Sequence, residues 1–313
     1  MGKAAKPASK TTSRTKAAAA SKAAALPKPA AVKERTAAPD APVLRPVPLY
    51  EFVTGGISGH VRLNDPGRGI EFTSTANGRA LPAYSQEVLS LRHYLSIGDS
   101  GLLAPRADAA CDGKVEKNAV VFSYDRPGKW PVAATARYEL LRDGGADATF
   151  TFVFSKPLKR FEAGIESLMP KSQPNVYVHS GGAWVRVAAG PQAQKFYPRN
   201  TGAAELILDG RWDALRMAGV SLAVEPQGYD YPILVVRDER TGWAFAYMAL
   251  TEDCSAVWVN GAERAVGMGL LAADVKAQEK AHCRVRVALC QAERLDDTLT
   301  HYRQFVQDAR ARK

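Results

Sequence analysis

The chain has 313 residues, of which 46% are hydrophobic, and a formal net charge of +10. This length fits one large all-β domain or two smaller domains, and it suffices to bury a sizeable core. The four cysteines form no Cys-x-x-Cys pair, so the sequence predicts no metal site. No apolar run approaches the roughly 18 residues of a membrane-spanning helix, so we expect no membrane span.

The positive charge is concentrated at the start of the chain. Residues 1–50 hold ten Lys and Arg against two acids, a net charge of +8. The remaining 263 residues hold 32 basic and 30 acidic side chains, a net charge of +2. The part of the chain expected to fold is therefore almost neutral, and most of the net positive charge comes from this first segment.

Residues 1–48 consist mainly of Ala, Lys, Pro, Ser and Thr, which cannot bury enough apolar surface to offset the entropy cost of ordering. We therefore predict a disordered basic tail. Three roles fit it: a solvated linker, non-specific contact with nucleic acid or another anionic surface, or an organellar transit segment. The run 17–20 is too short and too weakly apolar for a secretory signal, so we expect a cytoplasmic protein, with the transit segment as the alternative.

From Leu49 onward the sequence changes to short apolar runs separated by Gly and Pro turns. In the first half, runs typical of strands lie at 50–53, 57–63, 70–73, 115–124, 132–141 and 148–154. Asp143-Gly144-Gly145 predicts a hairpin turn between the last two of these. The segments 85–97 and 161–169 fit either a strand or a short helix.

In the second half, strands are predicted at 176–179, 184–187, 205–208, 221–224, 232–237, 243–248, 255–259 and 282–289. Gly181-Gly182 and the segment 238–242 predict hairpin loops. In the last strand, Cys283, Val285, Val287 and Leu289 alternate with Arg284 and Arg286, which predicts an inward apolar face and a wet face. We expect Cys283 to be a buried free thiol.

Only the segment 295–306 shows helical spacing of apolar residues. Many short strands, little helix and no internal repeat favour a large antiparallel sandwich over a propeller. We therefore predict an all-β protein with a large antiparallel β-sandwich and a C-terminal helix. It would comprise a disordered basic N-terminal tail over 1–48 and a single β-sandwich domain over 49–313.

Three parts of the sequence resemble the galactose mutarotase-like supersandwich, the superfamily of the aldose 1-epimerases. Glu225-Pro226-Gln227, at the end of the strand predicted at 221–224, resembles the Glu-x-Gln strand of the epimerases. The other two parts resemble an early region and the closing strands of such proteins: Leu91–Leu95 with Ala104–Arg106, and Gly269–Leu271 with Gln278–Glu279 and Arg284–Val287. The resemblance covers roughly residues 50–291 and implies a supersandwich (β-sandwich) fold with carbohydrate as ligand.

An epimerase needs a base for the proton of the anomeric hydroxyl and an acid for the ring oxygen. The resemblance gives Glu225 as the candidate base, with a solvated strand end as the alternative. His93 and His179 are the candidate acids. Each also has a structural interpretation, a satisfied packing residue for His93 and a turn residue beside Gly181-Gly182 for His179.

Sugar sites also use aromatic platforms and a few well-placed polar groups. Tyr229, Asp230 and Tyr231 lie between Gly228 and Pro232 and form the best candidate binding loop. Arg237 ends an apolar strand and needs a partner or a ligand. Trp258 is a further candidate platform, although large aromatic residues more often lie in the core.

These residues predict a carbohydrate-binding or carbohydrate-modifying domain, with a sugar or polysaccharide as partner and no cofactor. Whether it is an enzyme stays open. The alternative is a non-catalytic structural or interaction domain that the basic tail tethers to nucleic acid or another anionic surface. Convergent Glu, His, Arg and aromatic side chains on the concave face of the sheet would favour the first hypothesis, and a flat or apolar-filled face would favour the second.

Overall fold

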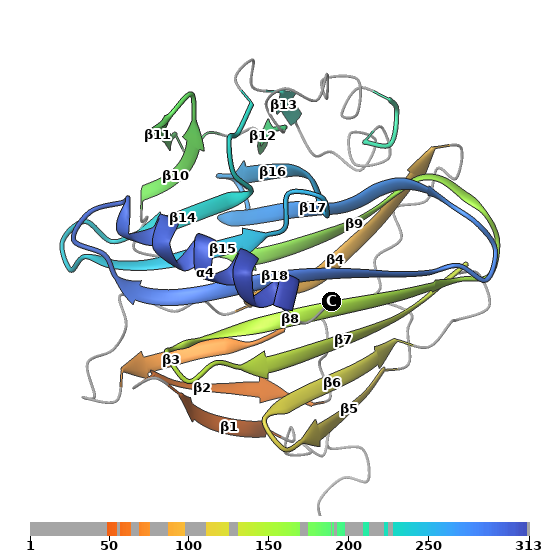
Figure 1. The fold of residues 1–313 in the computed structure, drawn as a ribbon, viewed down its shortest axis with the longest axis horizontal. Helices are drawn as coiled ribbons and strands as arrows, with labels where there is room; N and C mark the ends of the chain where they lie inside the picture. The colour runs from red at the N-terminus through yellow and green to blue at the C-terminus, as the bar shows by residue number, and fades with distance from the viewer. Residues whose placement is uncertain are drawn as a thin grey trace, which may run out of the picture. The chain divides into compact units, whose positions relative to one another are not determined.

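The computed structural model describes residues 49–54, 57–63, 69–75, 87–97, 111–124, 131–169, 175–188, 190, 193–197, 209–212, 222–224 and 228–311. The predicted tail over 1–48, the predicted strand at 205–208 and Glu225 lie outside these residues. The described part of the chain folds into three β-sheets and one helix, as Figure 1 shows. The predicted all-β, predominantly antiparallel sandwich with a C-terminal helix is confirmed.

The first strands form a small sheet in the order β1-β2-β3, with bounds Leu49–Thr54, Ile57–Arg62 and Glu71–Thr75. A nine-stranded sheet has the order β11-β10-β14-β15-β18-β8-β7-β6-β5. Its strands are, in chain order, β5 Cys111–Glu116, β6 Ala119–Tyr124, β7 Val132–Leu140, β8 Gly145–Phe154, β10 Asn175–Ser180, β11 Ala183–Val187, β14 Ile233–Arg237, β15 Trp243–Ala249 and β18 Lys280–Gln291.

A six-stranded sheet has the order β13-β12-β16-β17-β9-β4. Its strands are, in chain order, β4 Ser90–Ile97, β9 Leu158–Leu168, β12 Ala193–Phe196, β13 Leu222–Val224, β16 Cys254–Asn260 and β17 Ala265–Val275. All described strand pairs in the two large sheets are antiparallel except the pair β12 and β13. The chain therefore moves between the large sheets several times, which brings segments distant in sequence onto one surface.

The two ambiguous segments are both strands. Segment 85–97 contains β4 and segment 161–169 belongs to β9, and these two strands pair with each other. The single strand predicted at 115–124 is instead a hairpin of β5 and β6, turning at Lys117 with a φ of 30° and at Asn118. The turn contains neither glycine nor proline, so the sequence pattern gave no sign of a hairpin.

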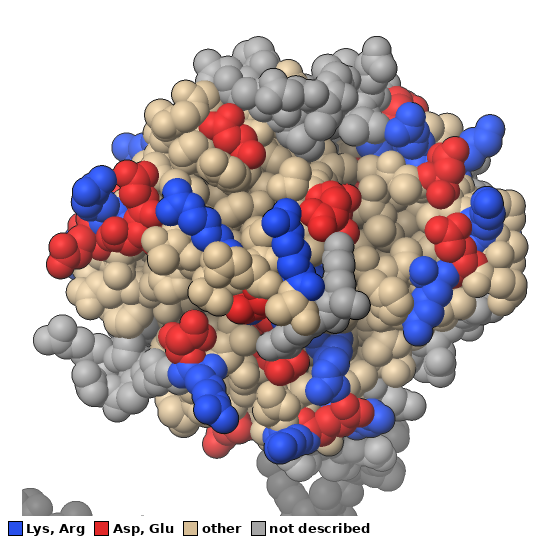
Figure 2. Space-filling model, in the orientation of Figure 1, with Lys and Arg blue, Asp and Glu red and all other residues tan. Residues whose placement is uncertain are grey.

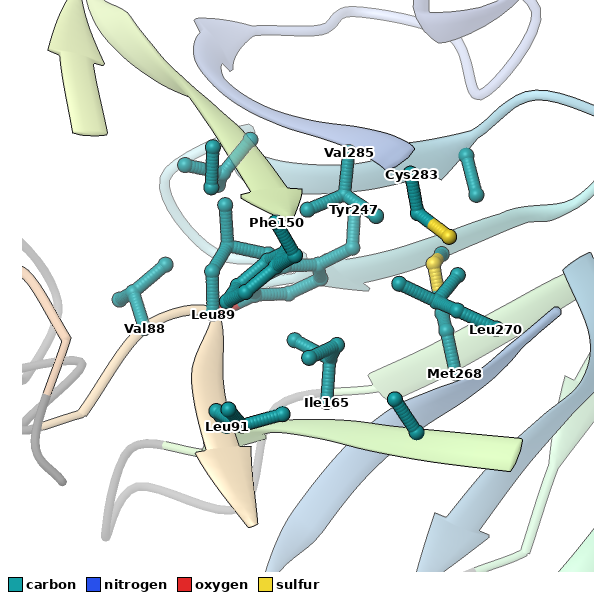
Figure 3. Close-up of a cluster of buried hydrophobic side chains, with 14 of the residues drawn as sticks. Val88, Leu89, Leu91, Phe150, Ile165, Tyr247, Met268, Leu270, Cys283 and Val285 are labelled. Carbon is teal, nitrogen blue, oxygen red and sulfur yellow. The ribbon is translucent and has the colours of Figure 1, made fainter. Parts of the chain in front are cut away.

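One large apolar core contains side chains of both large sheets. Figure 3 shows that Leu91, Ile165 and Met268 of the six-stranded sheet point toward Phe150 and Val285 of the nine-stranded sheet. The predicted apolar face of β18 lies in this core, because its four alternating residues are all buried there: Cys283, Val285, Val287 and Leu289. Cys283 is a free, buried thiol, as predicted.

The opposite face of the nine-stranded sheet carries the C-terminal helix α4, Asp297–Ala311. Phe305 is fully buried there against small residues of β15, among them Ala244 and Ala246. The prediction that Arg286 faces water is wrong, since its side chain is buried beneath α4. Arg286 is stabilised by ion pairs to Asp147 at 2.6 Å and to Asp308 at 2.9 Å, and its guanidinium lies 5.2 Å from the Phe305 ring centroid.

The surface charge agrees with the near-neutral balance of this part of the sequence. Figure 2 shows basic and acidic side chains interspersed on the face that carries α4, without a large area of one sign. No helix in the described part of the chain is both long and apolar enough to cross a membrane.

Candidate functional site

The structure divides the predicted site residues into two groups. His93 on β4 and Trp258 on β16 meet on the six-stranded sheet, with ring centroids 5.8 Å apart. His179 on β10 meets Asp230 and Tyr231 at the end of the nine-stranded sheet. The first group lies on the sheet face that points away from the core, and it is part of a larger polar cluster.

Three glycines make room for this cluster. Gly164 of β9 pairs with both His93 and Gly269 of β17, and Gly267 of β17 pairs with both Trp258 and Glu166. A Cβ atom at Gly164 would overlap the His93 ring, and one at Gly267 would overlap the Trp258 indole. In the sequence Gly267-Met268-Gly269 the methionine points into the core, so strand alternation places both glycines on the outer face. Large side chains of neighbouring strands fill the space that the glycines leave.

Trp212 covers the two rings from the segment 209–212. Its ring centroid lies 5.8 Å from that of His93 and 5.5 Å from that of Trp258, in edge-to-face arrangements of 79° and 77°. All three rings are at least 96% buried. Such contacts add to the burial energy and hold the ring planes in fixed orientations.

A buried ion-pair network lies beside the rings. Arg211 Nη1 donates to Glu162 Oε2 at 2.8 Å, and its Nε pairs with Asp209 Oδ2 at 2.8 Å. Ser255 Oγ donates to Glu162 Oε2 at 3.0 Å. Buried charges need such partners, because isolated ions lose several kcal/mol of hydration. Glu162 Oε1 is buried and accepts no hydrogen bond from the described part of the chain.

Glu166 is the most perturbed carboxyl group of this face. Trp258 Nε1 donates to its Oε1 at 3.3 Å, and Arg92 Nε lies 3.2 Å from its Oε2. Burial is the largest influence and raises the pKa of Glu166 to about 7, with Glu263 and Glu87 raising it further while Arg92 and Trp258 lower it. Its side chain retains 12% exposure. A carboxyl group with this pKa can both accept and donate a proton near neutral pH.

We call this cluster the polar face and define it by seven residues on one side of the six-stranded sheet: His93, Glu162, Glu166, Arg211, Trp212, Ser255 and Trp258. It combines two indole rings, an imidazole, two carboxyl groups, a guanidinium and a hydroxyl group. Glu, His, Arg and aromatic side chains thus converge on one face of the six-stranded sheet.

The second group of predicted residues is smaller. His179 Nδ1 lies 2.9 Å from Asp230 Oδ2, which also accepts the backbone N–H of Gly182 at 2.7 Å. Tyr231 and Trp184 each place a ring centroid 5.2 Å from that of His179. The hairpin turn at Gly181-Gly182 is thereby held against the loop before β14.

Arg237 and Tyr229 have contacts of their own. Arg237 pairs with Glu239 and donates from Nη2 to the carbonyl oxygens of Ala292 at 3.1 Å and Glu293 at 3.0 Å. Tyr229 is buried in the core and donates its hydroxyl to the carbonyl oxygen of Cys254 at 2.8 Å. The structure brings neither residue into the polar face, and their role in ligand binding stays a prediction. Glu225 lies outside the described residues, and its role as a base also stays a prediction.

The sequence hypothesis missed Glu162, Glu166, Arg211 and Trp212. A signal for the first two existed, because Glu162, Gly164 and Glu166 alternate with the apolar residues Phe161, Ala163 and Ile165. The ambiguity between strand and helix at 161–169 hid this alternation. Arg211 and Trp212 belong to a short segment outside any strand, and nothing in their local sequence indicates where they lie.

Comparisons with known proteins give matches in structure but none in sequence. No protein family and no curated protein matches the chain by sequence. Among solved structures, an α-N-acetylgalactosaminidase from Bifidobacterium bifidum in complex with GalNAc matches 83% of this chain with 12% identity and a TM-score of 0.53. The quadruple mutant of that enzyme matches the same share with 13% identity and a TM-score of 0.51. In both cases this chain spans 39% of the other chain's length.

A GalM/aldose epimerase homologue from C. elegans matches 79% of this chain and 100% of its own, with 7% identity and a TM-score of 0.47. The two matches with TM-scores above 0.5 show that this chain shares the β-sandwich fold of the Bifidobacterium bifidum enzyme, in agreement with the β-sandwich that the sequence resemblance implied.

Proposed function

We propose that the polar face is a carbohydrate site and that the domain binds or modifies sugars. The observation that carries the proposal is the juxtaposition of His93, Trp258 and Glu166 over Gly164 and Gly267 on a single sheet face. Carboxyl groups form hydrogen bonds with the hydroxyl groups of a sugar, and the Glu166 side chain, beside the buried rings of His93 and Trp258, retains 12% exposure.

The structural comparison supports the choice of ligand class. The Bifidobacterium bifidum enzyme with the similar fold is described as an α-N-acetylgalactosaminidase and was solved with GalNAc. Because this chain matches 39% of that enzyme at 12% identity, we take from it the ligand class and not the reaction.

Proton transfer is the chemistry that the face can supply. Exchange of sugar anomers needs a base at the anomeric hydroxyl and an acid at the ring oxygen. Glu166, with its pKa raised to about 7, holds a proton that it can exchange near neutral pH, and His93 lies on the same face. Glu225 keeps its proposed role as a base, since it follows β13, the edge strand of this sheet, directly in the sequence.

The test begins with a thermal-shift panel of neutral monosaccharides and short oligosaccharides, followed by calorimetry on those that stabilise the protein. A ligand present at a hundred times its dissociation constant stabilises the folded state by about 2.7 kcal/mol. Glu166→Gln is nearly isosteric and should weaken sugar binding about tenfold while the protein stays folded. Glu139→Gln, on the exposed side of β7, is the matched control and should bind as the wild type does.

For a sugar that binds, exchange of its anomers followed by NMR separates binding from catalysis. Acceleration that Glu166→Gln or Glu225→Gln abolishes identifies an epimerase. Binding without acceleration identifies a binding domain. A protein that no sugar of the panel stabilises, or a sugar whose affinity Glu166→Gln leaves unchanged, contradicts the proposed site.

A further inference from the structure

A cavity lies on α4, away from the residues of the polar face. It has a volume of about 240 Å³ and is lined by Tyr231, Leu299, Tyr302, Arg303, Val306, Gln307 and Arg310. Six of these residues belong to the helix, and Tyr231 comes from the loop before β14. We call this cavity the α4 pocket.

The floor of the α4 pocket is aromatic. The rings of Tyr231 and Tyr302 lie 5.5 Å apart at 50°, and Tyr231 is 40% exposed. Tyr231 is held from behind by the His179 ring, and the hydroxyl of Tyr302 lies 3.2 Å from that of Thr251. Burial raises the pKa of Tyr302, so its hydroxyl stays neutral at physiological pH. The pocket thus presents a fixed, partly exposed ring instead of a mobile side chain.

The rim of the α4 pocket is basic. Arg303 and Arg310 are seven residues apart, which places them on one side of the helix about two turns from each other. Both are exposed, neither forms an ion pair with a described residue, and the lining contains no carboxylate. The nearest acid of the helix, Asp308, is already held by Arg286 and Gln304. Two guanidinium groups therefore flank an aromatic floor with their hydrogen-bonding capacity open.

Packing of the helix does not account for these residues. α4 is held to the nine-stranded sheet by Tyr302, Phe305 and Ala309, together with the ion pair between Arg286 and Asp308. Arg303, Gln307 and Arg310 add no apolar burial to this contact. A partly exposed tyrosine ring that shares a pocket with two arginines, neither paired with an acid in the described part of the chain, is instead an arrangement that can bind a ring carrying a negative charge.

We propose that the α4 pocket binds a uronic acid residue of an acidic oligosaccharide. The sugar ring would stack on Tyr231, and its carboxylate would accept hydrogen bonds from Arg303 and Arg310. The volume is below the range of about 300–1,000 Å³ of most ligand pockets, so it suits one sugar ring instead of a long segment. Arginine pairs with planar carboxylates in a bidentate geometry, which a neutral sugar cannot exploit.

The α4 pocket and the polar face differ in charge. On and around the polar face, Glu87, Glu162, Glu166 and Asp209 outnumber Arg92 and Arg211, and both arginines are already paired with acids. The polar face therefore disfavours an anionic ligand, whereas the α4 pocket favours one. Binding of an acidic sugar is consequently a separate event from the binding proposed for the polar face.

The experiment titrates the whole chain with trigalacturonate and, in parallel, with neutral galactotriose in a calorimeter. We expect trigalacturonate to bind and the neutral sugar to bind at the pocket at least about tenfold more weakly. Arg303→Gln combined with Arg310→Gln should weaken trigalacturonate binding by at least about tenfold. The matched control, Arg240→Gln with Lys276→Gln, removes the same charge at exposed positions elsewhere and should leave the affinity within about twofold.

Two further variants separate a sugar from a bare anion. Tyr231→Ala should weaken trigalacturonate binding several-fold, whereas Tyr231→Phe keeps the ring and should bind normally. Inorganic phosphate binding as tightly as trigalacturonate, with no effect of Tyr231→Ala, would overturn the proposal in favour of a simple anion site. Absence of trigalacturonate binding would overturn it as well.

A second copy of the chain is the other candidate occupant. Sedimentation of the wild type and the double arginine variant tests it, because a dimer that the variant dissociates would overturn the sugar proposal. Glu166→Gln is expected to leave trigalacturonate binding unchanged. A failure at the α4 pocket is therefore distinguishable from a failure at the polar face.

Discussion

The two large sheets share one core but differ on the faces that point away from it. The outer face of the nine-stranded sheet carries small apolar residues such as Ala244 and Ala246, and α4 covers them with Phe305. The outer face of the six-stranded sheet carries glycines, and polar and aromatic side chains of neighbouring strands lie over them. On the nine-stranded sheet the small residues are covered by a helix. On the six-stranded sheet they are covered by the side chains of the polar face.

Residue size alone therefore does not decide how a sheet face is used. Alanine methyl groups form a smooth apolar surface, and burying that surface under a helix is favourable in itself. Glycine adds no apolar surface but lets a histidine or tryptophan lie flat on the backbone. The polar face is therefore held by its own contacts, and changes on the two faces should have different consequences.

The largest expected effect is on the helix-covered face. Phe305→Ala removes a fully buried ring that also supports the Arg286 guanidinium, and should lower the free energy of unfolding by about 3–5 kcal/mol. Urea denaturation measures this loss. Gln304→Ala, on the exposed side of the same helix, should cost less than about 0.5 kcal/mol. A loss below about 1 kcal/mol for Phe305→Ala would show that α4 is not an integral part of the domain.

The next effect concerns Glu166 and pH. Its pKa is raised to about 7 in the folded state, against about 4.3 in the unfolded state, so the folded state keeps a proton that the unfolded state releases between these values. The contribution to stability is complete below about pH 4.3 and is lost as the pH rises to about 7. It amounts to roughly 4 kcal/mol.

The measurement for Glu166 is urea denaturation of the wild type and Glu166→Gln between about pH 5 and pH 8. The stability of the wild type relative to the variant should fall by about 2–3 kcal/mol over this range, because the glutamine cannot ionise. Other titrating groups cancel in the difference. A difference that does not change with pH would mean that Glu166 is ionised throughout and that the polar face is more hydrated than its burial indicates.

A smaller effect is expected from filling the space above a glycine. Gly164→Ala should cost about 1–3 kcal/mol, because the added methyl group displaces a His93 ring that Trp212 and Trp258 hold in place. Combining it with His93→Ala should relieve most of this cost, which a double-mutant cycle measures. Gly190→Ala is the control, since its Cβ would meet one side-chain atom at 3.8 Å. Additive costs in the cycle would contradict the close packing of ring and backbone.

The smallest effect should come from the basic tail. Removal of residues 1–48 should leave the melting temperature within about a degree, because the composition of this segment offers little apolar surface to bury. A large fall would show that the tail packs on the sandwich. Nucleic-acid binding, if the wild type shows any, should disappear with the tail and weaken as salt is raised.

Alternation within single strands made the architecture predictable. The apolar face of β18 and the hairpins at 143–145, 181–182 and 238–242 were readable because each depends on a few adjacent residues. The hairpin between β5 and β6 was not, since its turn residues Lys117 and Asn118 carry no glycine or proline. The helix cover that buries Arg286 also lies beyond what a strand pattern can show.

The candidate site was predictable only in part. His93 and Trp258 were proposed for their chemistry, yet their contact depends on β4, β9, β17 and β16 lying side by side, and such register between distant strands is not written in any local pattern. Glu166 contacts Trp258 because the residue between them on β17 is Gly267, which has no side chain to keep them apart. The pairing of Arg211 with Glu162 depends on the short segment 209–212, whose place against the sheet no local sequence pattern indicates.

The proposed carbohydrate site is tested most sharply by asking whether a sugar reaches the polar face. Replacing the tryptophans with 5-fluorotryptophan allows this to be followed by ¹⁹F NMR. The resonances of Trp212 and Trp258 are assigned by their loss in Trp212→Phe and Trp258→Phe. During titration with the sugar that stabilises the protein most, we expect the resonances of Trp212 and Trp258 to shift while those of Trp184 and Trp243 stay unchanged. Shifts confined to Trp184 or Trp243, on the nine-stranded sheet, would contradict the account.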